Sequence, residues 1–116
     1  MPHIRALFVD TPEVRGFLKA QKTEIRKIVA DTIGYPPDEV AIFPESISVG
    51  DFELADNLLP LEFVINSGTR SLDKEDELAE QMKMAILAQC SGAANINFGL
   101  WLISHEKNAF VESKPS

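Results

Sequence analysis

An internal repeat constrains this chain more than any other feature of its sequence. The apolar residues Ile4 and Phe8 have apolar counterparts 57 residues later, Leu61 and Ile65, so the two apolar patterns align at a constant offset. Three further apolar pairs keep the same offset: Ala6 with Phe63, Ile25 with Met82, and Val29 with Ile86. A repeat of this length indicates a duplicated supersecondary unit. We therefore interpret the 116 residues as one domain with two halves, 1–57 and 58–116.

The pattern of the first half predicts a strand, a helix and a second strand. Ile4–Val9 is an apolar strand pattern. Thr11, followed by proline, is typical of a helix start, because the hydroxyl caps the helix and proline fits its first turn. Apolar residues then recur at helical spacing until Gly34, which ends the helix. A short strand, Val40–Phe43, follows, and a long connection, Glu45–Pro60, leads to the second half.

The second half repeats this order of elements. Leu61–Ile65 is the strand, and Ser71 is the expected cap of a helix that ends near Gly92. Ile96–Ile103 is the fourth strand. The apolar residues in Asn108–Glu112 predict a short additional strand at the C-terminus, which would pair with a neighbour's edge.

These elements predict an α/β architecture, called α+β in some classifications. Each half is a β-α-β crossover with parallel strands, and together they form a four-stranded mixed sheet with both helices on one face. The strands are apolar at nearly every position, as in Ala6–Val9 and Leu100–Ile103. A sheet that faces water on one side alternates polar and apolar residues. We therefore expect a second subunit to cover the other face.

Charge and hydropathy exclude several classes of function. The chain has 18 acidic and 11 basic residues and a net charge of −7, whereas a nucleic-acid-binding domain needs a basic surface. No apolar run of about 18 residues exists, so we expect no membrane span, and the N-terminus has no signal-peptide pattern. Together with a single cysteine, Cys90, which excludes an internal disulfide, these features favour a cytoplasmic protein.

Histidine and cysteine offer no metal site in the sequence. His3 and His105 have no cysteine or acidic partner at ligand spacing, so we predict no metal and no cofactor. Cys90 lies on the apolar face of the second predicted helix, where we expect it to be an inert core residue.

Three segments, by their order and spacing along the duplicated pattern, resemble the tautomerase superfamily. Met1–Ile4 resembles the start of 5-carboxymethyl-2-hydroxymuconate isomerase and of a further bacterial branch. Ile33–Ala41 is similar to a helix-to-strand turn of macrophage migration inhibitory factor. Ser67–Asp73 is similar to a loop of 4-oxalocrotonate tautomerase (4-OT). The resemblance covers most of the chain and implies a homotrimer in which the three sheets line a central barrel. Trp101 either lines the pocket or packs in this barrel, and we expect packing.

The resemblance also implies a catalytic base. Members of the superfamily use the amine of an N-terminal proline, which here requires removal of Met1 to expose Pro2. A free α-amine has a pKa of about 8, which an apolar site or a nearby cation lowers toward neutrality. Such an amine takes a proton from a carbon beside a carbonyl group and returns it elsewhere. The alternative is that Pro2 merely starts an edge strand, where its missing N–H costs nothing.

The resemblance implies that the third strand runs antiparallel to the first, so that its C-terminal end lies beside Pro2. Arg70 follows that end and is the expected partner of a substrate carboxylate, because its planar guanidinium suits that group. The alternative is a loop arginine that pairs with the helix start or a surface acid. The resemblance also points to Ser67 as the position of a backbone donor and to Asn97 as a residue from a neighbouring subunit, although Asn97 is equally well explained as an outward polar residue. Tyr35 stands where migration inhibitory factor has a lysine that binds the substrate acid.

Together these positions predict a tautomerase or isomerase that acts on a small-molecule substrate. The expected substrate is a carboxylate-bearing 2-oxo or 2-hydroxy compound. Decarboxylation and dehalogenation use the same proline within the superfamily, so they stay open as reaction classes. The alternative function is a non-catalytic trimer with a binding or assembly role, and removal of Met1 is the first property that distinguishes the two.

Overall fold

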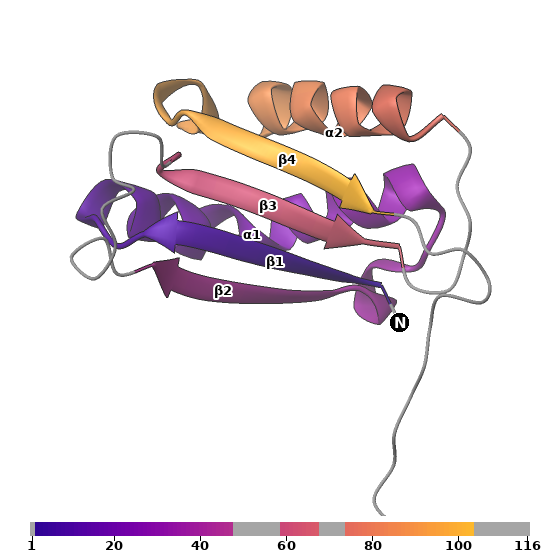
Figure 1. The fold of residues 1–116 in the computed structure, drawn as a ribbon, viewed down its shortest axis with the longest axis horizontal. Helices are drawn as coiled ribbons and strands as arrows, with labels where there is room; N and C mark the ends of the chain where they lie inside the picture. The colour runs from indigo at the N-terminus through magenta and orange to yellow at the C-terminus, as the bar shows by residue number, and fades with distance from the viewer. Residues whose placement is uncertain (1, 48–58, 68–73, 104–116) are drawn as a thin grey trace, which may run out of the picture.

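The computed structural model describes residues 2–47, 59–67 and 74–103. Its strands and helices follow one another along the chain in two similar series (Figure 1). They are β1 (His3–Val9), α1 (Pro12–Ile33), the 3₁₀ turn η1 (Pro37–Glu39), β2 (Ala41–Ile47), β3 (Leu61–Asn66), α2 (Glu75–Gln89), the 3₁₀ turn η4 (Ala93–Asn95) and β4 (Phe98–Ile103).

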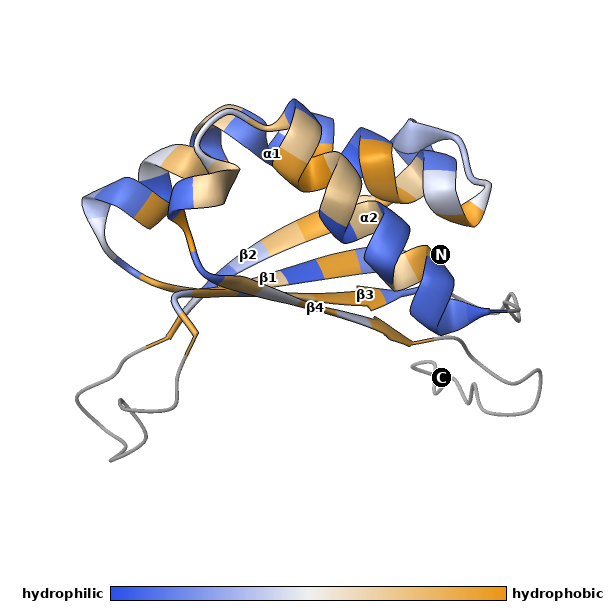
Figure 2. Ribbon diagram, turned by 90° about the horizontal axis from the view of Figure 1, so that it is seen from above, coloured by the Kyte–Doolittle hydropathy of each residue, from blue (hydrophilic) through white to orange (hydrophobic). Residues whose placement is uncertain are grey.

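The four strands form one mixed sheet in the order β2-β1-β3-β4. β1 is parallel to β2 and β3 is parallel to β4, so each half is a β-α-β unit. The halves meet where β1 and β3 run antiparallel, with His3 opposite Asn66 and Phe8 opposite Leu61. Both helices lie on the same face of this sheet (Figure 2). The predicted duplication and the one-sided arrangement of the helices are confirmed.

Local chemistry fixes the ends of α1 as the sequence predicts. The Thr11 hydroxyl accepts a hydrogen bond from the Val14 N–H at 3.3 Å, and Pro12 occupies the first helical position. At the other end Gly34 adopts a left-handed conformation with φ 81°, and its N–H donates to the Ala30 carbonyl at 2.9 Å. A side chain is strained in that conformation, which is why glycine ends the helix here.

Two predicted strand boundaries are wrong. β2 continues to Ile47 and passes through Pro44, so the connection does not begin at residue 45. Proline is tolerated there because β2 lies at the edge of the sheet, and no other described strand needs the N–H of residue 44. The fourth strand begins at Phe98, because Ile96 closes the 3₁₀ turn with a hydrogen bond to Ala93.

Several other predictions fall on segments outside the described residues. The predicted cap of α2, Ser71, is wrong, because α2 begins at Glu75. Its N-cap is Lys74, which adopts a left-handed conformation and makes no side-chain capping hydrogen bond. Ser71, Arg70 and His105 lie outside the described residues, and so does the predicted C-terminal strand. Among the helices that are described, none is long and apolar enough to cross a membrane.

The hydrophobic core lies between the helices and the sheet. It combines alternate residues of the strands, such as Ile4 and Phe63, with the inner faces of the helices, such as Ile25 and Ile86. Cys90 belongs to this core with 3% of its surface exposed. Burial raises the pKa of its thiol, and the Glu24 carboxylate adds to that effect, so the thiol stays protonated at neutral pH. The expectation of a core cysteine is confirmed.

The face of the sheet away from the helices is partly apolar and partly charged. Leu100 and Leu102 pack against the core, so Trp101 points to the opposite face, where 61% of it is exposed. Its indole N–H donates to the Glu62 carboxylate. The large apolar side chains Phe43 and Ile103 are also exposed, at 53% and 44%. This mixture differs from the predicted strands, which were apolar at nearly every position. Trp101 lies on the face that the predicted barrel would enclose, and its packing there stays a prediction.

Candidate active site

Pro2 lies at the end of the sheet where β1 begins. It is buried, and its carbonyl accepts a hydrogen bond from the Ala41 N–H at 3.3 Å, which joins it to the start of β2. On the other side β3 runs antiparallel to β1, and His3 pairs with Asn66. Pro2 precedes His3 and Ser67 follows Asn66, so the antiparallel register makes Pro2 and Ser67 neighbours across the two strands. The antiparallel arrangement that the resemblance implied is therefore present, and it brings the C-terminal end of β3 beside Pro2.

Ser67 is fully buried at this end of the sheet. Its backbone N–H donates to the Ile103 carbonyl at 3.0 Å, so in this chain the backbone donor is engaged by the last residue of β4. Its own carbonyl lies 3.4 Å from the Tyr35 hydroxyl, which donates to it. This distance is longer than an ordinary O–H···O bond, so the contact is weak.

Tyr35 reaches the site from the end of α1. Its N–H donates to the Ala30 carbonyl at 2.9 Å, directly after the left-handed Gly34. The side chain is half-buried and crosses toward the end of β3. The sequence places it there because Gly34 and Pro36 end the helix at this point. Pro2, Ser67 and Tyr35, three of the five predicted site residues, thus lie at one end of the sheet.

The other two predicted residues are not brought to Pro2 by the described part of the chain. Asn97 is exposed just before β4, and β4 begins opposite Leu61, which itself lies opposite Phe8. It therefore stands at the far end of the sheet from Pro2. Arg70 lies outside the described residues, three positions after Ser67.

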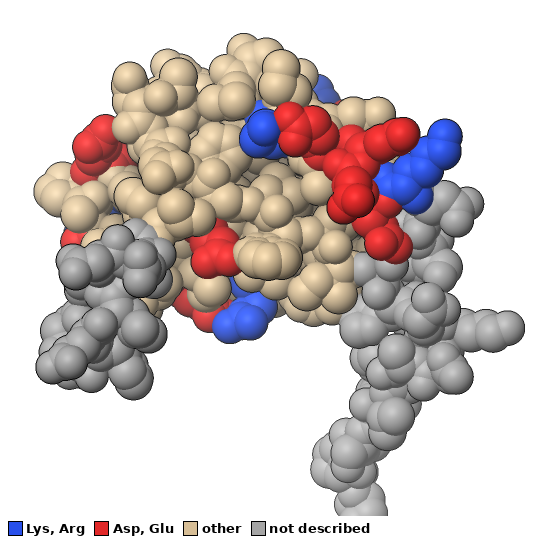
Figure 3. Space-filling model, turned by 45° about the horizontal axis from the view of Figure 1, so that its top comes forward, with Lys and Arg blue, Asp and Glu red and all other residues tan. Residues whose placement is uncertain are grey.

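Acidic side chains gather where α2 begins (Figure 3), at the same end of the sheet as Pro2 (Figure 1). Glu75, Asp76 and Glu77 form the first turn of the helix, where their charge is favourable next to the helix dipole. An anionic substrate at this end therefore needs a nearby cation. Within the described residues no group of three or more histidine, cysteine or acidic side chains is placed to hold a metal ion.

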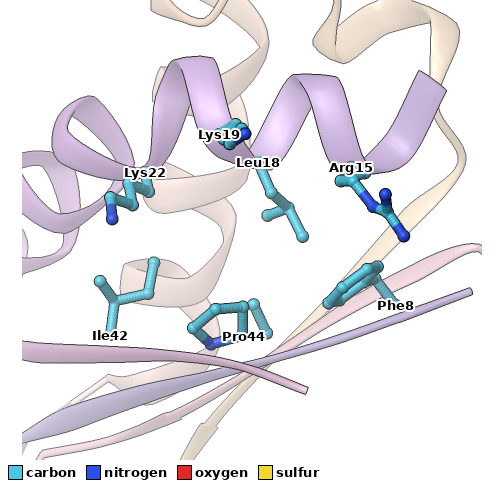
Figure 4. A pocket seen from close by; sticks show the side chains of 8 residues that line it. Phe8, Arg15, Leu18, Lys19, Lys22, Ile42 and Pro44 are labelled. Atoms are coloured by element: carbon cyan, nitrogen blue, oxygen red, sulfur yellow. The ribbon is translucent and has the colours of Figure 1, made fainter. Parts of the chain in front are cut away.

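The structure also contains a cavity beneath α1 that was not predicted from the sequence. This cavity of about 170 Å³ lies between the first half of α1 and the strands β1 and β2 (Figure 4). Three cations, Arg15, Lys19 and Lys22, stand along it. Their spacing of four and then three residues places them on one stripe of a helix, and this spacing was readable in the sequence.

No family model matches the sequence, and no curated protein matches it. Solved structures do match over nearly the whole chain. A fused 4-OT, described as an asymmetric trimer, is 14% identical with a TM-score of 0.62, covering 95% of this chain and 91% of its own. Pt0534, inactivated by 2-oxo-3-pentynoate, is 17% identical with a TM-score of 0.55, covering 97% and 90%.

A third match is to macrophage migration inhibitory factor, which the sequence analysis also named. Macrophage migration inhibitory factor from Toxoplasma gondii is 14% identical with a TM-score of 0.55, and the match covers 98% of this chain and 96% of that one. At these identities the likeness establishes the fold alone. The duplicated β-α-β units, the strand order and these matches agree, and this chain has the fold of the tautomerase superfamily.

Proposed function

We propose that this protein is a tautomerase or isomerase that acts on a small carboxylate-bearing 2-oxo or 2-hydroxy compound. The observation that carries the proposal is the placement of Pro2: it is buried, at the start of β1, beside the end of β3 and within the same cluster as Ser67 and Tyr35. Once Met1 is removed, the nitrogen of Pro2 is a secondary amine at this end of the sheet.

The proposed chemistry is a proton transfer by that amine. The nitrogen takes a proton from the carbon next to the substrate carbonyl, and the C–H electron pair becomes the double bond of an enolate. The protonated amine then returns the proton to oxygen or to a second carbon. An apolar surrounding disfavours a charged ammonium, so burial at this position would lower the pKa of the amine toward neutrality and favour its action as a base.

The remaining roles are assigned to groups around the amine. Arg70, three positions after Ser67 in the sequence, is the proposed partner of the substrate carboxylate. The Tyr35 hydroxyl, whose contact to Ser67 is weak, is the proposed donor to the developing enolate. Asn97 is proposed to act at the active site of a neighbouring subunit, because in its own chain it lies at the far end of the sheet.

A homotrimer is part of this proposal. The exposed face of the sheet carries Phe43, Trp101 and Ile103, which are large apolar side chains that an isolated subunit leaves in water. The matched fused 4-OT is an asymmetric trimer. Packing three such sheets together would cover these side chains and bring Asn97 of one chain toward another.

Mass spectrometry and proton exchange test the function in one sample. We expect the intact mass of untagged protein to lack Met1, and we expect deuterium to enter one of a panel of 2-oxo acids. We also expect 2-oxo-3-pentynoate, which inactivates Pt0534, to leave an adduct on Pro2 in a peptide map. Retention of Met1 in native material, or a free Pro2 that exchanges nothing and forms no adduct, would favour the non-catalytic trimer instead.

The assembly is tested by charge substitution on the exposed sheet face. Trp101→Glu is expected to lower the native mass from three chains to one, because it places a carboxylate in an apolar contact. Met84→Glu is the matched control, since Met84 is 57% exposed on α2, outside the proposed interface. Light scattering at micromolar concentration measures both. A wild-type protein with the mass of one chain would remove the trimer from the proposal.

A further inference from the structure

The cavity beneath α1 has an apolar wall and a basic rim. Ala6 and Phe8 of β1 and Ile42 and Pro44 of β2 form its floor, and Leu18 of α1 forms its roof. Figure 4 shows Leu18 pointing from the helix toward the strands, with Arg15 above Phe8 and Lys22 above Ile42. Ala6 lies opposite Pro44 in the parallel register of β1 and β2. Two small side chains therefore face the helix at this point, and they leave a volume of about 170 Å³ unfilled.

The three cations differ in how far their charge is neutralised. The Nε of Arg15 donates to Asp10 at 2.9 Å, and a second hydrogen bond joins the same two side chains. Lys19 and Lys22 are exposed, and in the described ranges no carboxylate lies within 4 Å of either ammonium group. In a chain with a net charge of −7, two adjacent unneutralised lysines at the mouth of an apolar cavity are positioned to attract an anion.

We propose that this cavity binds a monocyclic aromatic carboxylate. A cavity of about 150 Å³ lined by Leu, Ile and Phe side chains accommodates benzene, so this cavity of about 170 Å³ fits one six-membered ring. The ring would contact Phe8, Leu18 and Ile42, and the carboxylate would lie at the mouth between the ammonium groups of Lys19 and Lys22. Inorganic phosphate has no apolar part for the floor, and a fatty acyl chain exceeds the volume.

This site is separate from the one proposed around Pro2. Phe8 lies six positions from Pro2 along β1, which corresponds to about 20 Å of strand. None of the described residues that line the cavity belongs to the cluster of Pro2, Ser67 and Tyr35. The inference therefore does not rest on the proposed function, and loss of one site leaves the other intact.

Titration of the full-length protein with benzoate tests the proposal by nuclear magnetic resonance. We expect saturable shifts of the Leu18 and Ile42 methyl signals, with no comparable change at Tyr35. Benzamide has the same ring without the charge, and we expect it to bind about tenfold more weakly, as expected when a charge-assisted contact is lost. Equal binding of benzoate and benzamide, or no methyl shift at millimolar benzoate, would overturn the proposal.

Two lysine variants assign the anion contact. Lys19→Gln and Lys22→Gln are each expected to weaken benzoate binding about tenfold. Lys27→Gln, on the same helix but outside the cavity lining, is expected to leave it unchanged. Affinity that is the same in all three variants would contradict the assignment. Contacts from the Leu18 methyl groups to another segment of this chain or to a second copy would show that the cavity has a protein occupant, which also overturns the proposal.

Discussion

An N-terminal extension that turns the Pro2 nitrogen into an amide is expected to lower the rate of proton exchange about 10²- to 10⁴-fold, the usual contribution of a general base. The lone pair of an amide nitrogen is delocalised into the carbonyl group, so it cannot take a proton. Pro2→Ala is a less decisive variant, because alanine keeps a free α-amine with a pKa of about 8. The extension changes the nitrogen and leaves every side chain of the site in place.

Cleavage of the extension directly before Pro2 is the control for this experiment. If the amine is the base, cleavage restores exchange to the rate of the protein that has lost Met1. The same extension on the C-terminus is expected to have no effect on the rate. If the extended and cleaved proteins exchange equally fast, the Pro2 nitrogen is not the base. Activity would then need another group in the cluster, such as the Tyr35 hydroxyl, which contacts the Ser67 carbonyl.

The internal repeat explains why so much of the fold was predictable. Ile4 and Leu61 share a register, so the sheet could be inferred as two equivalent halves, and both residues are indeed fully buried. The caps of α1 depend on Thr11 and Gly34, whose preferences are strong enough to be read locally. Pro44 instead made the end of β2 hard to predict, because a proline usually ends a strand. β2 continues past Pro44 because it lies at the edge of the sheet.

The candidate sites were predictable to different degrees. Pro2 and Ser67 lie together because the antiparallel pairing of β1 and β3 makes them neighbours, and that pairing was implied by the resemblance. Arg70 lies outside the described residues, so its role stays a prediction. The cavity depends on the meeting of Ala6 with Pro44 beneath Leu18, and such a packing defect has no sequence signature, although the cations beside it share a visible helical stripe.

Truncation of Ile86 to alanine is expected to lower the free energy of unfolding by about 2–5 kcal/mol. Ile86 is fully buried on α2 and packs in the core between the helices and the sheet. Removal of its side chain loses buried apolar surface and leaves a cavity that the neighbours fill only in part. Since the total stability of a domain is about 5–15 kcal/mol, the change is large enough to appear as a clear shift in the midpoint of urea unfolding.

Leu87→Ala is the matched control, because Leu87 is the next residue of the same helix and has a side chain of the same composition. It is 40% exposed, so the loss of buried surface is smaller, and we expect a decrease below about 1 kcal/mol. Both changes introduce alanine, so helix propensity can contribute only the small difference between isoleucine and leucine, which is well below the expected loss from the core. Equal losses in the two variants would contradict the placement of Ile86 in the core and of Leu87 at the surface. That placement sets the rotation of α2 over β3 and β4, and therefore which side of this helix faces the sheet that carries the Pro2 cluster.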